Sequence, residues 1–132
     1  MKVSSNLSER TLREIYLKGF RIAVEAAPWA LMSSYNRING IYAPNCPELL
    51  IDILRCEWGY KGLVMSDWDA MEQCDYVTAV KSGNNMIMPG SKKVAKALKQ
   101  ALDSGMLTRN DLLPGATYAL RVIMSAATSQ EA

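Results

Sequence analysis

The sequence of 132 residues contains no histidine. This absence excludes Ser-His-Asp and Cys-His catalytic sets, HExxH zinc sites and any imidazole that acts as a general base. Acid and base chemistry in this chain therefore falls to carboxylates, lysines, tyrosines or cysteines.

Cysteine is scarce as well. Cys46, Cys56 and Cys74 are odd in number and never form a CxxC pair, so we expect neither a disulfide framework nor a zinc site. We interpret all three as reduced, semi-buried small side chains. We also expect no bound metal and no cofactor.

The chain has little net charge and no long apolar run. A net charge of +2 gives little long-range attraction to nucleic acid, and we interpret the lysines at 92, 93, 96 and 99 as an ordinary solvated helix face. No span of about 20 apolar residues could cross a bilayer, and no basic start precedes an apolar signal segment. We therefore expect neither nucleic acid nor membrane as a partner, and a soluble chain in the cytoplasm.

What the chain does have is enough apolar sequence for one core, since 49% of its residues are hydrophobic. Apolar residues at helical spacing alternate with short apolar runs between turn residues. The expected helices are 8–27, 47–58, 70–81, 92–104 and a last one from 108, and the expected strands are 29–32, 62–66 and 86–88.

Three details complete this prediction. Asn6 and Glu9 fit a capping box at the first helix, although Ser8 also fits its start. Pro114 and Gly115 are expected to interrupt the last helix in its first turn. The tail 128–132 is expected to be frayed.

A threefold strand–helix alternation is typical of a parallel sheet, whose strands are buried on both faces and have continuous apolar sequences. The sequence therefore predicts an α/β fold with short parallel strands, about three βα units and flanking helices. Three units are fewer than half of an eight-unit barrel and few for a doubly wound sheet. We expect residues 1–132 to be a single, partial domain.

Ligands of parallel α/β folds bind at the carboxyl ends of the strands, here at 33–36, 66–69 and 89–91. Asp67 directly follows an apolar run, which is where a nucleophile or base would be placed. The competing interpretation is that Asp67 binds loop amides while Asp69 caps the next helix.

The neighbouring apolar residues have two interpretations as well. Trp68 is either a platform for a sugar ring or a rim residue that closes the core. Met32 and Tyr35 are by default a strand core residue and a loop aromatic. The Gly90-Ser91-Lys92 segment lacks the first glycine of a phosphate-binding loop, so it is a weak signal.

Several segments together resemble glycoside hydrolase family 3, the β-glucosidase family. These are residues 8–17 (SERTLREIYL), 32–40 (MSSYNRING), 50–60 (LIDILRCEWGY), 62–68 (GLVMSDW) and 83–90, which ends in Met88-Pro89-Gly90. The resemblance covers most of 6–124 in the family's order and spacing.

The resemblance implies a partial TIM barrel, the C-terminal third of the family's catalytic (β/α)8 domain. It further implies that Asp67 is the catalytic nucleophile and that Trp68, Met32 and Tyr35 surround the sugar ring in the glycone subsite. The implied substrate is a β-linked glucoside or related sugar. A retaining glycosidase of this kind uses two carboxyl groups about 5 Å apart.

The sequence also departs from the family. The upstream Lys-His pair and the Asp and Arg that hold sugar hydroxyls are missing, and the family's acid/base usually lies in a second domain. We therefore expect a fragment that carries the nucleophile, lacks the acid/base and is inactive in isolation. The alternatives are a non-catalytic module that associates with a partner or with itself through open sheet edges, and a small sugar-binding α/β protein.

Overall fold

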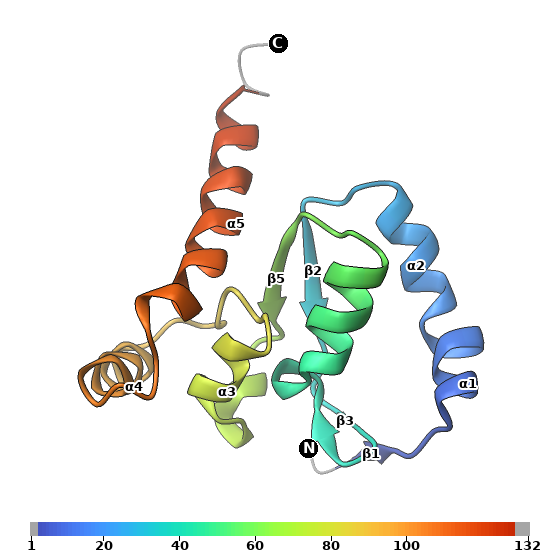
Figure 1. The fold of residues 1–132 in the computed structure, drawn as a ribbon, viewed down its shortest axis with the longest axis horizontal. Helices are drawn as coiled ribbons and strands as arrows, with labels where there is room; N and C mark the ends of the chain where they lie inside the picture. The colour runs from blue at the N-terminus through green and yellow to red at the C-terminus, as the bar shows by residue number, and fades with distance from the viewer. Residues whose placement is uncertain (1–2, 129–132) are drawn as a thin grey trace.

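Two parallel strands lie at the centre of the fold (Figure 1). The computed structural model describes residues 3–128. β2 (Ala30–Ser33) pairs in parallel with β5 (Leu63–Ser66), so that Ala30 is opposite Leu63 and Ser33 is opposite Ser66. Both strands were expected, and their carboxyl ends meet at one edge of the sheet.

A helical segment precedes β2 and consists of α1 (Glu9–Thr11), the π-helical η1 (Leu12–Tyr16) and α2 (Lys18–Glu25). Its N-cap is Ser8 rather than Asn6, because the Ser8 hydroxyl accepts the Thr11 backbone N–H at 3.1 Å. The Asn6 carboxamide is instead engaged by the Ser4 hydroxyl at 2.9 Å.

The crossover between the two strands is helical, as parallel pairing requires. It contains the short 3₁₀ helix η2 (Ala43–Asn45) and η3 (Glu48–Glu57), a π-helix that ends before Gly59 at φ 67°. The crossover packs its apolar side on the strands. The main core cluster consists of Val24, Leu50, Leu54, Tyr60 and Val64, and a second one of Leu12, Leu17 and Ile53.

A small second sheet, which the sequence did not predict, combines one strand from before β2 with two strands from after it. It has the order β1 (Ser4–Ser5), β3 (Arg37–Ile38), β4 (Ile41–Tyr42). Asn39 and Gly40 connect β3 to β4 with φ angles of 50° and 87°, which is the left-handed backbone of a two-residue hairpin turn. The Asn39-Gly40 pair favours such a turn, but strands of two residues are too short to give a periodic pattern.

The single helix expected over 70–81 is wrong. The structure has a 3₁₀ turn, η4 (Ala70–Gln73), and then α3 (Tyr76–Lys81). The Asp75 carboxylate accepts the Thr78 backbone N–H at 2.7 Å and so starts a new helix. Asp69 has a left-handed backbone, φ 58°, and makes no capping bond with its side chain, so the expected cap at Asp69 is wrong too.

The third strand, expected over 86–88, is reduced to one parallel bridge between Met65 and Met86. Side chains take the backbone groups that a longer ladder would use. The Asn85 carboxamide oxygen accepts the Val64 N–H at 3.0 Å, and the Ser66 hydroxyl accepts the Met88 N–H at 2.8 Å. Within the described residues the central sheet therefore has two paired parallel strands, fewer than the three expected.

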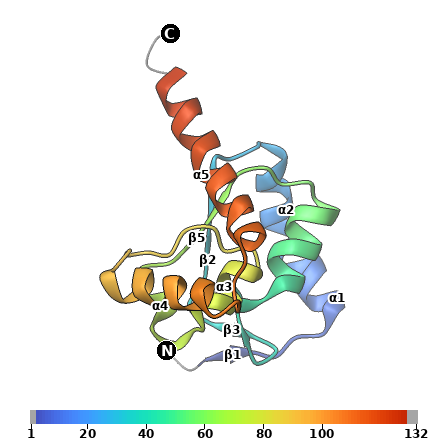
Figure 2. The same ribbon diagram turned by 60° about the vertical axis from the view of Figure 1, so that its left-hand side comes forward.

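The chain ends in two helices, α4 (Lys92–Asp103) and α5 (Arg109–Thr128). Contrary to expectation, α5 continues through Pro114. Pro114 deprives the helix of one N–H, while Thr108 and Asp111 cap its start reciprocally and the Tyr118 ring stacks on Arg55 at 3.9 Å. The C-terminal half of α5 extends away from the remaining elements (Figures 1 and 2). Apart from Thr128, the expected frayed tail lies outside the described residues.

Candidate functional site

Asp67 directly follows β5, and its backbone is fixed on both sides. Its N–H donates to the Ser33 carbonyl of β2 at 3.2 Å, and its carbonyl accepts the Ala70 N–H at 3.2 Å. One carboxylate oxygen, Oδ1, accepts the Trp68 backbone N–H at 2.6 Å. The half-buried carboxylate is thus rigidly held at the strand end and does bind a loop amide, so the two interpretations of Asp67 are compatible.

Tyr35 lies beside this carboxylate. Its hydroxyl donates to the backbone carbonyl of Trp68. Burial raises the pKa of Tyr35 above its ordinary value, and the negative charges of Asp67 and Asp69 raise it further. Tyr35 therefore remains a neutral hydrogen-bond donor across the physiological pH range.

Trp68 and Met32 are exposed, with 57% and 58% of their surfaces accessible. The default interpretation of Met32 as a strand core residue is therefore wrong, and Trp68 does not close the core. Met32 lines an apolar hollow of about 270 Å³ together with Tyr16 and Phe20, whereas Trp68 and Tyr35 line a different one. The structure brings Asp67, Trp68 and Tyr35 together and sets Met32 in a separate hollow.

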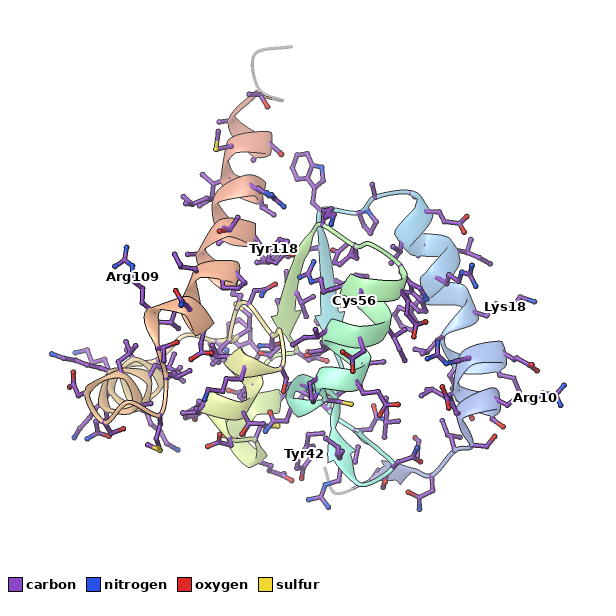
Figure 3. All side chains as sticks on the ribbon, in the orientation of Figure 1. Arg10, Lys18, Tyr42, Cys56, Arg109 and Tyr118 are labelled. Atoms are coloured by element: carbon purple, nitrogen blue, oxygen red, sulfur yellow. The ribbon has the colours of Figure 1, made fainter. Side chains whose placement is uncertain are left out.

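The hollow beside Trp68 has a volume of about 260 Å³. It is lined by Tyr35, Tyr42, Trp68, Asp69, Ala70, Glu72 and Gln73. In Figure 3, Tyr42 lies at the end of the molecule toward which the arrowheads of β2 and β5 point. Tyr42 and Gln73 were not predicted as members of this region, because the hairpin and η4 are brought together only by the fold.

Three buried polar side chains, those of Ser33, Ser66 and Asn84, form hydrogen bonds near the carboxyl ends of β2 and β5. The Ser33 hydroxyl donates to the Asn84 side-chain oxygen at 3.2 Å, and the Asn84 amide donates to the Met86 carbonyl at 3.2 Å. Ser66 is 1% exposed and bonds to Met88. These residues stand next to the ends of short apolar runs in the sequence, which is the signal that could have identified them.

The carboxylates of Glu57 and Asp75 form hydrogen bonds with other residues. Glu57 accepts two hydrogen bonds from Arg13, at 2.6 and 2.8 Å, and this pairing lowers the pKa of Glu57. Hydrogen bonds from Thr78 lower the pKa of Asp75. Both groups are therefore held ionised near neutral pH and are unsuited to donate a proton as a catalytic acid.

Another hollow, of about 810 Å³, does not have Asp67 in its lining. Its lining comes from α4, α5 and the segment 83–91, is mainly apolar and includes Arg55 and Tyr118. Figure 3 shows Tyr118 pointing from α5 toward β5. The lining of this hollow includes one carboxylate, Asp111, which accepts the Thr108 N–H at 2.7 Å.

Within 3–128, no group of three or more cysteine, aspartate or glutamate side chains is arranged to hold a metal ion. The same segment has no helix that combines the length and hydropathy needed to span a bilayer. All three cysteines are free thiols, but Cys56 is exposed, in contrast to the semi-buried position expected for it.

Comparisons with known proteins agree on one family. Residues 2–122 match the model of the glycosyl hydrolase family 3 N-terminal domain. Probable beta-glucosidase J of Emericella nidulans is 44% identical over 112 residues, which are 83% of this chain and 13% of that protein. Thermostable beta-glucosidase B of Acetivibrio thermocellus is 39% identical over 128 residues, 96% of this chain and 17% of that protein.

Solved structures give the same result. The beta-glucosidase of Kluyveromyces marxianus in complex with glucose superposes with a TM-score of 0.92 and 35% identity, over 98% of this chain and 16% of that one. Beta-glucosidase 3B of Thermotoga neapolitana in complex with glucose has a TM-score of 0.88 and 40% identity, over 92% of this chain and 18% of that one. The chain thus spans less than a fifth of each of these relatives.

Proposed function

Because the chain belongs to glycosyl hydrolase family 3, we propose that it is the part of a retaining β-glycosidase that carries the nucleophile, Asp67. The observation that carries this proposal is the position of Asp67 at the carboxyl end of a buried parallel strand, with its backbone bonded to Ser33 and Ala70. Such rigidity keeps a carboxylate aimed at a bound sugar without an entropic cost at the moment of attack.

The chemistry follows from the carboxylate. A free oxygen of Asp67 attacks the anomeric carbon, the bond from that carbon to the leaving oxygen breaks, and a glycosyl-enzyme ester forms. Water then cleaves the ester, so the sugar leaves with its configuration retained. The Trp68 N–H at 2.6 Å from Oδ1 orients the attacking group.

The neighbouring side chains form one wall of the glycone subsite in this proposal. The exposed Trp68 indole offers an apolar face to the sugar ring, and Tyr35 offers a neutral hydroxyl beside Asp67. Met32 lines the separate hollow of about 270 Å³, so we assign it the outer edge of the subsite.

We assign the chain to the C-terminal third of a (β/α)8 barrel. In this assignment β2, β5 and the bridge at Met86 are three consecutive barrel strands, and the helical segments 43–57 and 70–81 are their crossovers. We assign the acid/base to a part of the enzyme outside this chain; within the chain, Glu57 and Asp75 are unsuited to the role because Arg13 and Thr78 hold them ionised.

A leaving group that needs no acid tests this proposal. With 2,4-dinitrophenyl 2-deoxy-2-fluoro-β-glucoside, we expect release of one dinitrophenolate per chain and a mass increase of one fluorosugar on the peptide that contains Asp67. Asp67→Asn should give neither, while Asp103→Asn on α4 serves as the matched control. With an aryl β-glucoside that has a poor leaving group, we expect no turnover; turnover that Asp67→Asn abolishes would reveal an acid within the chain.

The second candidate is a non-catalytic module that associates with a partner or with another copy. Two observations favour it. Among the described residues β2 pairs only with β5, which leaves its other edge open, and the adjoining hollow exposes Tyr16 and Phe20 by 54% and 53%. Light scattering over a concentration series distinguishes the two candidates, since a monomer with cooperative unfolding argues against association through this edge.

A further inference from the structure

Asn84 is a buried polar side chain that no step of the proposed reaction uses. Only 1% of its surface is exposed. Its carboxamide oxygen accepts the Ser33 hydroxyl at 3.2 Å, and its amino group donates to the Met86 carbonyl at 3.2 Å. Water has little access to either bond, and a buried polar group without a partner costs free energy. This position therefore needs a side chain that donates and accepts at the same time.

The two bonds of Asn84 complete a closed ring of hydrogen bonds around the backbone of Asp67. The Asp67 N–H donates to the carbonyl of Ser33, whose hydroxyl donates to Asn84. The Met86 carbonyl, which accepts the Asn84 amide, also accepts the N–H of Ser66 at 2.8 Å. Ser66 is joined to Asp67 by a peptide bond, so the ring closes there. Asn84 is the link of this ring that connects β2 to the chain segment after α3.

This segment holds the residues on both sides of Asp67. The Met88 N–H donates to the Ser66 hydroxyl at 2.8 Å, and the Met88 carbonyl accepts the Asp69 N–H at 3.0 Å. The loop between these two bonds contains the Asp67 carboxylate and the Trp68 N–H, which donates to its Oδ1 at 2.6 Å. A displacement of the segment would therefore move the Trp68 N–H relative to Oδ1 and turn the carboxylate.

The neighbouring polar side chains form other hydrogen bonds. The Ser66 hydroxyl bonds to the Met88 backbone. The Asn85 side-chain oxygen accepts from Arg55 and from the backbone of β5. Because none of these side-chain bonds involves β2, Asn84 has a connection that the other two residues do not replace.

We propose that Asn84 is a positioning residue for Asp67. By closing the ring it fixes the direction of the Asp67 carboxylate, and thereby sets the rate of attack on the sugar but not the affinity for the sugar. Asn84 touches no substrate in this proposal, and no bond to it forms or breaks. The inference rests on the proposed function, in which Asp67 is the nucleophile.

The first test needs no sugar and follows the backbone amide proton of Trp68 by nuclear magnetic resonance of the full chain. A short hydrogen bond to a carboxylate moves this signal downfield, and Asp67→Ala gives its position without the bond. Asn84→Leu keeps the branched shape but neither donates nor accepts, so we expect it to move the signal upfield toward that position. The control is Leu107→Ala, which removes a buried side chain outside the ring and should lower stability but leave the signal in place.

The second test measures the rate of attack. Trapping by 2,4-dinitrophenyl 2-deoxy-2-fluoro-β-glucoside over a range of concentrations separates the limiting rate from the half-saturating concentration. We expect Asn84→Leu to lower the limiting rate about tenfold to hundredfold and to leave the half-saturating concentration unchanged. Ser33→Ala removes the same link from the side of β2 and should change both readouts in the same direction, so it replaces Asn84→Leu if that variant does not fold.

Two results would overturn the positioning role of Asn84. One is a Trp68 signal that stays in place when the link is removed. The other is a raised half-saturating concentration with an unchanged limiting rate. An unaltered chain that is not trapped at all would overturn the proposed function instead, and the Trp68 signal would then still decide whether Asn84 orients the Asp67 carboxylate.

Discussion

The backbone N–H of Met88 donates a hydrogen bond of 2.8 Å to the hydroxyl of Ser66, the residue directly before the nucleophile candidate Asp67. Ser66 is 1% exposed, so no water can replace the hydroxyl. We expect Ser66→Ala to lower the free energy of unfolding by about 1–3 kcal/mol, because it leaves a buried N–H unpaired. Urea denaturation checks this, with the exposed Ser104→Ala as control; equal stability of the two variants would contradict the role of Ser66.

Substitution by alanine should have opposite effects on stability at Gly62 and at Gly19. A Cβ on Gly62 would lie 2.6 Å from the Pro28 carbonyl oxygen and would overlap the Tyr60 phenol. Gly62→Ala should therefore destabilise the chain by about 1–3 kcal/mol. Gly19 has open space and lies in α2, so Gly19→Ala should stabilise by about 0.5–1 kcal/mol. Thermal unfolding of both variants distinguishes them by the sign of the shift in Tm.

Arg55 connects four parts of the fold. Its Nη1 donates to the carbonyls of Tyr60 and Gly62 at 2.9 and 2.6 Å, its Nη2 donates to Asn85 at 2.8 Å, and it stacks on Tyr118. Lysine cannot make this fork, so Arg55→Lys should cost about 1–3 kcal/mol.

The matched control for Arg55 is Arg109→Lys, since Arg109 is exposed at the start of α5 (Figure 3). Chemical denaturation of the two variants provides the comparison. An Arg55→Lys chain as stable as Arg109→Lys would show that the charge alone, and not the planar guanidinium, holds α5 on the strands.

Acid should destabilise the chain through Asp75. Hydrogen bonds from Thr78 lower the folded-state pKa of Asp75, so its contribution to stability is present above its ordinary pKa of about 3.9 and is lost as pH falls through the lower folded value. Asp75→Asn should therefore flatten the fall of stability between about pH 4 and pH 2.

A neutral cap provides the control for Asp75. The Ser91 hydroxyl accepts the Val94 N–H at 3.2 Å at the start of α4, and Ser91→Ala should lower stability by about 1 kcal/mol at every pH. Unfolding curves at several pH values measure both slopes. If the free energy of unfolding falls with pH as steeply in Asp75→Asn as in the unaltered chain, groups other than Asp75 cause the loss of stability in acid.

The parallel strands and their helical crossover were predictable, because continuous apolar runs such as 62–66 have no alternative to burial on both faces. The reduction of the expected third strand to a single bridge was not predictable, since the Asn85 and Ser66 side chains take backbone groups that its ladder would use. The break between η4 and α3 depends on Asp75, whose carboxylate caps α3 although the helical pattern of apolar residues continues across this position.

Some residues of the candidate site could also be predicted from the sequence, and others could not. Asp67 and Trp68 follow β5 directly, so their position at the strand end could be predicted from the chain order alone. The contact of Tyr42 with Gln73 joins the hairpin to η4, and no local pattern encodes it. The exposure of Met32 also escaped prediction, because an isolated strand segment does not reveal which neighbours cover it.

The hydrogen bond from the Asp67 N–H to the Ser33 carbonyl has a consequence for folding. It joins parallel strands that approach each other only after the intervening helix has packed, which makes it a contact of high sequence separation. The Asp67 amide should then exchange its hydrogen only through global opening, unlike amides within α4, which open locally. Partially folded forms of the chain would therefore have the helices before they have an organised carboxylate.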